Sequence, residues 1–243
     1  MRRAERKTSD RLIVALDFTT LAPALAMARK LRGLVRTVKV GSALFTACGP
    51  PAVKRLRALG FEVMLDLKVF DIPNTVELSC RSATRLRVSK LTVHAAGGRR
   101  MLEAAVQGVR DEAQRMRLAP SQRPAVLAVT VLTSVERGAS SILAPRVKHL
   151  ARAALEAGCN GVVASVEEAR DIRTMFHHDQ FEIICPGIRP SWAFRDDQRR
   201  LGTPTQALQA GADLLVVGRP IIAARDPAVA ARRILKEMEA TSC

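Results

Sequence analysis

One short stretch of the sequence brings acidic and basic side chains together at a spacing that could move a proton. In the run DLKVFDIPNT, residues 66–75, Asp66 and Lys68 are two residues apart and Asp71 follows. If the run begins as a strand, Asp66 and Lys68 point to one side while Leu67 points to the other. Asp66 would hold the Lys68 ammonium charged and in place. An ammonium fixed in this way can protonate a carbanion, which is general-acid chemistry.

Other polar groups stand within or at the ends of apolar, strand-like runs. Asp17 ends the first run, Lys39 lies in the second, and Thr133 follows the fifth. A single aspartate after a strand usually caps a turn. Several charged side chains that point into the protein interior must form ion pairs or take part in binding or catalysis, because burying an unpaired charge is costly. A structural ion-pair network is the alternative to a catalytic array.

Eight apolar, β-rich runs would position these groups, and their starts are spaced by about 29 residues, the length of one strand-plus-helix unit. The runs are 12–16, 38–40, 62–67, 90–94, 125–132, 161–165, 182–187 and 213–218. Apolar residues at helical spacing lie between them, as in 147–155. The pattern predicts an α/β fold, a single-domain (β/α)8 TIM barrel spanning residues 11–243 behind a basic N-terminal extension, residues 1–10. A doubly wound sheet is the alternative.

In such a barrel the active site lies at the carboxyl ends of the strands, and phosphate commonly binds after the last strands. Gly218 and Arg219 follow the eighth run, and Arg189 follows the seventh. A glycine lets backbone N–H groups approach an oxyanion, and an arginine can bind it with two hydrogen bonds. We therefore expect a phosphate site there, with an ordinary surface turn as the alternative. Trp192 and Phe194 are expected in the loop after Arg189 rather than in the core.

Composition restricts the class of protein. The chain has 243 residues, 48% of them hydrophobic, and a formal net charge of +16. No apolar run approaches the ~18 residues of a membrane span, and the five cysteines form no CxxC pair. We expect a cytoplasmic protein with reduced thiols and no membrane contact. Aromatic residues are only 3%, which argues against specific nucleic-acid binding, although a non-catalytic barrel that binds nucleic acid through its charge remains an alternative.

Taken together, the motifs resemble the orotidine 5′-phosphate decarboxylase family. ALDF, KVG, DLKVFDIPNTV, VHAAGG, AVTVLTS, PGIRP, DDQRR and VVGRP occur in that family's order across residues 11–235. The resemblance implies conversion of orotidine 5′-monophosphate (OMP) to uridine 5′-monophosphate (UMP) and CO2, the last step of de novo UMP synthesis. It also implies that no metal or organic cofactor takes part, and that the protein is a homodimer with shared active sites.

The resemblance further implies a role for each residue that carries it. Lys68 would protonate C6 of the pyrimidine, and Asp66 and Asp71 would flank the substrate carboxylate. Lys39 would complete the charge array and, with Asp17, contact the ribose hydroxyls. Thr133 would contact the base. The phosphate would be bound by Arg189, Gln198, Gly218 and Arg219. Asp71 and Thr75 would reach into the partner subunit's site.

The nearest rival has the same fold. It is a metal-dependent decarboxylase or aldolase of sugar phosphates, related to keto-gulonate-phosphate decarboxylase and hexulose-phosphate synthase. Those enzymes share the D-x-K-x-x-D element, but they use Mg2+ and resemble one another in carrying a carboxylate where this chain has Lys39. A lysine at that position would repel a divalent cation. The sequence therefore favours the nucleotide enzyme.

Overall fold

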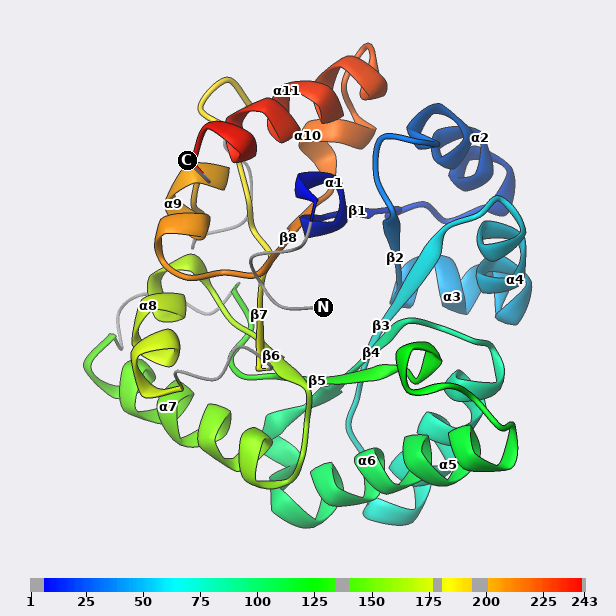
Figure 1. The fold of residues 1–243 in the computed structure, drawn as a ribbon, viewed down its shortest axis with the longest axis vertical. Coiled ribbons are helices and arrows are strands. Elements are labelled where there is room, and N and C mark those ends of the chain that lie inside the picture. The colour runs from blue at the N-terminus through cyan, green and yellow to red at the C-terminus, as the bar shows by residue number, and fades with distance from the viewer. Residues whose placement is uncertain (1–6, 134–139, 177–180, 194–200, 242–243) are drawn as a thin grey trace.

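The computed structural model describes residues 7–133, 140–176, 181–193 and 201–241. Its eight strands form a closed parallel barrel in sequence order, with β8 pairing with β1 and helices around the outside (Figure 1). The strands are β1 (Leu12–Ala15), β2 (Thr37–Gly41), β3 (Glu62–Val69), β4 (Lys90–His94), β5 (Ala125–Val129), β6 (Gly161–Val163), β7 (Glu182–Cys185) and β8 (Leu214–Val217). The (β/α)8 barrel expected from the apolar runs is confirmed.

Helix α1 precedes β1, and the other helices follow the strands along the chain. They are α1 (Thr8–Arg11), α2 (Leu21–Leu31), α3 (Ser42–Cys48), α4 (Pro50–Ala58), α5 (Pro73–Arg85), α6 (Gly98–Arg115), α7 (Ser140–Glu156), α8 (Val166–Met175), α9 (Pro204–Gln209), α10 (Arg219–Ile222) and α11 (Pro227–Ala240), with 3-10 turns η2 (Ala95–Gly97) and η3 (Pro120–Gln122). Proline occupies the first turn of several of them, where its missing N–H costs nothing.

The strands are mostly apolar because both of their faces are buried. Along β1, Leu12 and Val14 pack in the layer between barrel and helices, whereas Ile13 and Ala15 pack in a second cluster. That second cluster contains alternate residues of other strands, such as Met64 of β3 and Val216 of β8. It is the filled interior of the barrel. The strand period of two therefore directs every second residue toward the barrel axis.

Buried ion pairs and hydrogen bonds tie the amino end of the barrel. Arg11 of α1 donates to the backbone carbonyls of Ala212 and Asp213, at the start of β8. The Asp213 carboxylate accepts from Arg173 of α8 and, at 2.7 Å, from the backbone N–H of Ile183. In Figure 1, α1 lies beside β1 and β8. These contacts close the amino end of the barrel, and the carboxyl ends of the strands are left to form a site.

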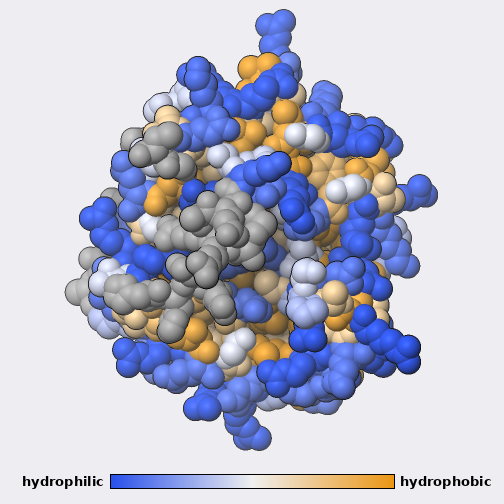
Figure 2. All heavy atoms as spheres, in the orientation of Figure 1, coloured by the Kyte–Doolittle hydropathy of each residue, from blue (hydrophilic) through white to orange (hydrophobic). Residues whose placement is uncertain are grey.

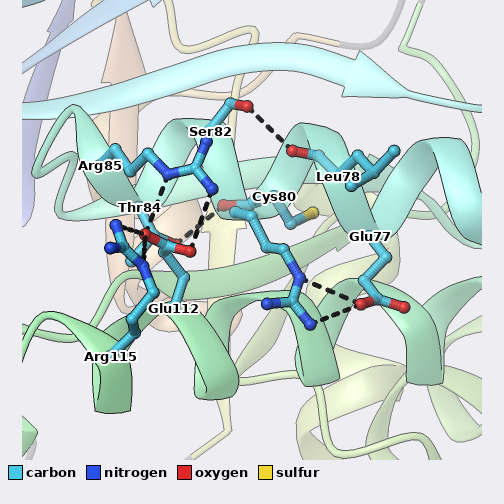
Figure 3. A network of polar contacts seen from close by, with 9 residues as sticks. Glu77, Leu78, Cys80, Ser82, Thr84, Arg85, Glu112 and Arg115 are labelled. Carbon is cyan, nitrogen blue, oxygen red and sulfur yellow. Dashed lines mark hydrogen bonds and ion pairs between the residues drawn. The ribbon is translucent and has the colours of Figure 1, made fainter.

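Helices α5 and α6 pack closely and are joined by a polar network (Figure 3). The Glu112 side chain is 1% exposed and accepts hydrogen bonds from Arg85 and Arg115. Those bonds lower the pKa of Glu112 to about 2. Gly108 lies so close to α5 that a Cβ there would come within 2.5 Å of the Glu77 carbonyl oxygen. The network holds α5, and so the turn between β3 and α5, against α6.

Four cysteines have free thiols, as expected, and Cys243 lies outside the described residues. Burial raises the pKa of Cys80 and Cys159 to about 12, so neither is a thiolate near neutral pH. Hydrophilic residues cover most of the face seen in Figure 2. Within the described ranges, no helix combines the length and apolar character needed to cross a membrane.

Candidate active site

A cavity of about 210 Å³ opens at the carboxyl ends of the strands. Its wall combines apolar residues with charged and polar ones, and the latter are Asp17, Lys39, Asp66, Lys68, Thr133, Arg189 and Arg219. The apolar runs 125–132, 161–165, 182–187 and 213–218 are longer than the strands they contain. Part of the excess lines this cavity, including Val131, Ala164, Pro186 and Gly218. The ends of these runs therefore build the site rather than the sheet.

Asp66 lies between two lysines on one side of the cavity. Lys68 Nζ donates to Asp66 Oδ2 at 2.9 Å, and Lys39 Nζ lies 3.3 Å from the same oxygen. Lys39 Nζ also donates to Oδ1 of Asp17 at 3.3 Å. The four groups thus alternate in charge, in the order Asp17, Lys39, Asp66 and Lys68.

Electrostatics keep the centre of this array ionised. Burial alone would raise the pKa of Asp66, but the charges of Lys39 and Lys68 outweigh it and hold that pKa below its usual value. Burial would likewise lower the pKa of Lys39, but Asp66 and Asp17 raise it overall. The Lys68 side chain is 36% exposed and that of Lys39 only 12%. Lys68 is therefore the ammonium more accessible to a molecule in the cavity.

The backbone of β3 is irregular where it presents Lys68. Leu65 pairs with Leu91 of β4, but the next pair is Val69 with Val93. Between these two pairs, β3 therefore has two more residues than β4. Lys68 has a φ of 51°, in the left-handed region that side chains other than glycine rarely adopt. The sequence predicted that Asp66 and Lys68 would share a face by simple strand alternation. Both do line the cavity, but Lys68 reaches it through a bulge with a strained backbone.

Thr92 of β4 is a neighbour of the array that sequence reasoning missed. It is 1% exposed and its hydroxyl bonds both Asp66 and the backbone of Lys68. The available signal was a polar residue inside the otherwise strand-like run KLTVH, on the strand next to β3. Without the register of β3 and β4, that signal could not identify its partners.

The segments after β7 and β8 bring the predicted Arg189, Gly218 and Arg219 to the same cavity. Arg189 is buried, and its Nη1 donates to the carbonyl of Ile188 at 3.1 Å. A Cβ at Gly218 would lie 3.3 Å from Asp17 Oδ2, tighter than most contacts, so glycine suits this point where β8 passes the array. Arg219 follows it and also lines the cavity. Gln198 lies outside the described residues.

Trp192 differs from expectation. It packs against the outer apolar core, and the guanidinium carbon of Arg233 lies 4.7 Å from its ring centroid. Trp192 does lie in the segment after Arg189, but the expectation that it stays out of the core is wrong, because α11 supplies a surface that the local sequence does not reveal. Phe194 lies outside the described residues.

Asp71 and Thr75 do not line the cavity. Asp71 is exposed, and its Oδ1 accepts from the backbone N–H of Ile72 at 2.6 Å. Thr75 is half-buried in the first turn of α5. Around them three large apolar side chains are exposed to solvent in this single chain, namely Phe70 at 62%, Ile72 at 66% and Leu78 at 55%. The segment thus faces outward from its own barrel.

Comparison with known proteins identifies the family of this site. Residues 10–234 match the model of the orotidine 5′-phosphate decarboxylase / HUMPS family. The chain belongs to this family. It is 44% identical to the orotidine 5′-phosphate decarboxylase of Paramagnetospirillum magneticum, with 93% of this chain and 97% of that protein aligned. It is 48% identical to the orotidine 5′-phosphate decarboxylase of Halorhodospira halophila, over 95% and 96% respectively.

Solved structures agree with this membership of the orotidine 5′-phosphate decarboxylase / HUMPS family. The crystal structure of the orotidine 5′-phosphate decarboxylase from Lactobacillus acidophilus matches with a TM-score of 0.79 and 34% sequence identity. The match covers 94% of this chain and 99% of that one. The family model spans two branches, and the curated relatives just described carry the name of the decarboxylase branch.

Proposed function

We propose that this chain decarboxylates OMP to UMP and CO2, the final step of UMP synthesis. The observation that carries the proposal is the Asp17–Lys39–Asp66–Lys68 array in a cavity that Arg189 and Arg219 also line. An orotate carboxylate and a 5′-phosphate are both anions at the two ends of one molecule. Relatives named for this reaction, at 44–48% identity, support it.

Lys68 is the proton donor in this proposal. The bond between C6 and the carboxylate carbon breaks, CO2 leaves, and the electron pair remains on C6. A proton on Lys68 Nζ then passes to C6, and solvent restores it. The pyrimidine ring cannot readily delocalise a carbanion in the plane of C6, so a positioned ammonium supplies both the stabilising charge and the proton.

The neighbouring groups prepare that lysine. Asp66, ion-paired with Lys68 at 2.9 Å, orients its ammonium group. Asp66, with Asp71, would also face the substrate carboxylate, so that loss of neutral CO2 removes a like-charge contact. Lys39 offsets the charge of Asp66 and keeps it ionised. Two ammonium groups on Asp66 also disfavour a divalent cation there, so we assign the reaction to side chains alone.

Substrate binding falls to the rest of the wall. We assign Asp17 and Lys39 to the ribose hydroxyls and Thr133 to the base. The phosphate site comprises Arg189, Gln198, Gly218 and Arg219. The phosphate is remote from C6, so its binding energy can be used to order the site around the reacting carbon.

We propose further that two copies of the chain form a dimer with shared sites. The support is the outward position of Asp71 and Thr75 amid the exposed side chains of Phe70, Ile72 and Leu78. Exposed apolar groups of this size mark contact surfaces when they cluster. A two-fold interface there would carry each Asp71 toward the partner's cavity. The cytoplasmic location and the lack of a specific nucleic-acid partner stay predictions.

Turnover of OMP by the purified chain tests the proposed reaction. Loss of the orotate absorbance and appearance of UMP are expected. Conversion of a keto-gulonate or hexulose phosphate, with no change in OMP, would instead support the metal-dependent branch. Strong, salt-sensitive RNA binding without any decarboxylation would support the non-catalytic alternative.

Arg219→Ala should raise KM for OMP and lower kcat/KM by about 10- to 100-fold, because a charge-assisted hydrogen bond to the phosphate is lost. Orotidine, which lacks the phosphate, should react equally slowly with the variant and the parent. Arg225→Ala removes an exposed arginine that does not line the cavity and serves as the control. An equal loss with OMP and with orotidine would contradict the phosphate role.

A further inference from the structure

Thr92 links the carboxylate at the centre of the array to the backbone that carries the proton donor. Its Oγ1 accepts from the backbone N–H of Lys68 at 2.9 Å and donates to Asp66 Oδ1 at 2.9 Å. A hydroxyl has one proton, and the amide N–H occupies one of its lone pairs. Its proton must therefore go to the carboxylate. Both bonds have a fixed direction.

The first bond replaces one that the sheet has lost. Between the pairs Leu65–Leu91 and Val69–Val93 the ladder of β3 and β4 is interrupted. The backbone N–H of Lys68 lies in this interruption, and a part-buried donor without a partner would be costly. The threonine hydroxyl satisfies it. It thereby stabilises the bulge in which Lys68 holds its φ of 51°.

The second bond, from the Thr92 hydroxyl to Asp66, gives each carboxylate oxygen of Asp66 a partner. Oδ2 faces Lys39 and Lys68, while Oδ1 faces Thr92. The carboxylate is thus fixed from both sides, and the hydroxyl contributes to its lowered pKa after the two lysine charges. If the carboxylate could rotate freely, the Lys68 ammonium would no longer be held in the position from which it protonates C6.

Packing alone does not fix this part of β3. A cavity of about 90 Å³ lies beside the bulge, lined by Leu65, Leu67, Val69, Leu91 and Thr92, with α5 residues Ser79, Cys80 and Ala83. The strand therefore has room to relax toward α5 if the hydroxyl is removed. The bond from Thr92 is then the local restraint that keeps the bulge in place.

We propose that Thr92 is a positioning residue for decarboxylation, holding Asp66 and the backbone of Lys68 in register without touching substrate. The inference rests on the proposed OMP decarboxylation. Failure of the proposed reaction and failure of the proposed role of Thr92 can be distinguished. A wild-type chain that does not convert OMP would refute the reaction. An active wild type with an equally active Thr92→Val would refute only the role of Thr92.

Thr92→Val keeps the shape and removes the hydroxyl, so kcat for OMP should fall by about 10- to 100-fold. The dissociation constant for UMP should change less than about threefold, because Thr92 does not line the main cavity. Thr92→Ser restores the hydroxyl and should bring kcat to within about threefold of wild type. The acid limb of the kcat profile should move to higher pH in Thr92→Val, because loss of the donor raises the pKa of Asp66.

Thr37→Val is the matched control, since Thr37 is a buried strand threonine of β2 that does not line the cavity. It should leave kcat and its pH profile unchanged. Equal loss in Thr37→Val and Thr92→Val, equal loss in Thr92→Ser, or a Thr92→Val kcat within about twofold of wild type would each overturn the proposal. Thr92→Ala replaces Thr92→Val if the valine variant does not fold. If neither folds while Thr92→Ser does, Thr92 serves stability and the proposal fails.

Discussion

Lys68→Ala should lower kcat for OMP by roughly 10⁴-fold or more, because both a general acid and a stabilising charge are lost. Among the described residues that line the cavity, Lys39 is the other lysine, and it is 12% exposed and already lies between Asp17 and Asp66. Steady-state kinetics on the purified variant, with UMP binding measured on the same sample, separates this loss from a loss of binding. The melting temperature should change little, because Lys68 is partly exposed.

Lys68→Arg and Lys54→Ala make the test specific. The arginine variant keeps a positive charge near Asp66, but a guanidinium does not release its proton near neutral pH. It should therefore remain inactive if proton donation is the role of Lys68. Lys54 is exposed on α4 and does not line the cavity, so its loss should be silent. Turnover by Lys68→Ala above a few per cent of wild type would remove Lys68 as the donor.

Mixing Asp71→Ala with Lys68→Ala subunits should restore activity to two proteins that are each inactive alone. In a hybrid dimer, one site combines an intact Lys68 with an intact Asp71 from the other subunit. The second site lacks both. Random exchange between equal amounts of the two makes about half of the dimers hybrid, with one working site in each, so about a quarter of wild-type activity is expected for a two-fold dimer.

Separate affinity tags on the two variants allow the hybrid to be isolated and its activity measured directly. A mixture of Asp71→Ala with the double variant Asp71→Ala/Lys68→Ala is the control, because no hybrid site in it is complete. Activity that stays absent in isolated hybrids would show that Asp71 does not act across an interface. Asp71 would then serve its own chain, against its exposed position outside the cavity.

Much of the fold could be predicted because a strand buried on both faces is a continuous apolar run in the sequence. Each predicted apolar run overlaps one strand of the barrel, and residues 90–94 match β4 completely. The later runs extend past the ends of β5, β6, β7 and β8. Hydrophobicity cannot distinguish a residue in the ladder from one that lines a cavity just beyond it, since both are shielded from water. Strand ends were therefore the weakest part of the prediction.

The charged residues that line the cavity could be predicted from the sequence, but their geometry could not. Strand alternation correctly directed Asp66 and Lys68 to one cavity, yet the left-handed backbone of Lys68 depends on how β3 pairs with β4. Thr92 was missed for the same reason. Its role depends on a cross-strand register, and a single sequence does not contain register explicitly. Local patterns thus identify the charged groups, whereas pairing between distant segments positions them.

Turnover of OMP after removal of divalent metal tests most directly whether the side chains of this array do the chemistry alone. The purified chain would be dialysed against EDTA and assayed with EDTA present, with and without excess Mg2+. Two ammonium groups on Asp66 predict the same kcat in all samples, within about twofold. Loss of turnover in EDTA, restored by Mg2+, would contradict a lysine-based, metal-free decarboxylation.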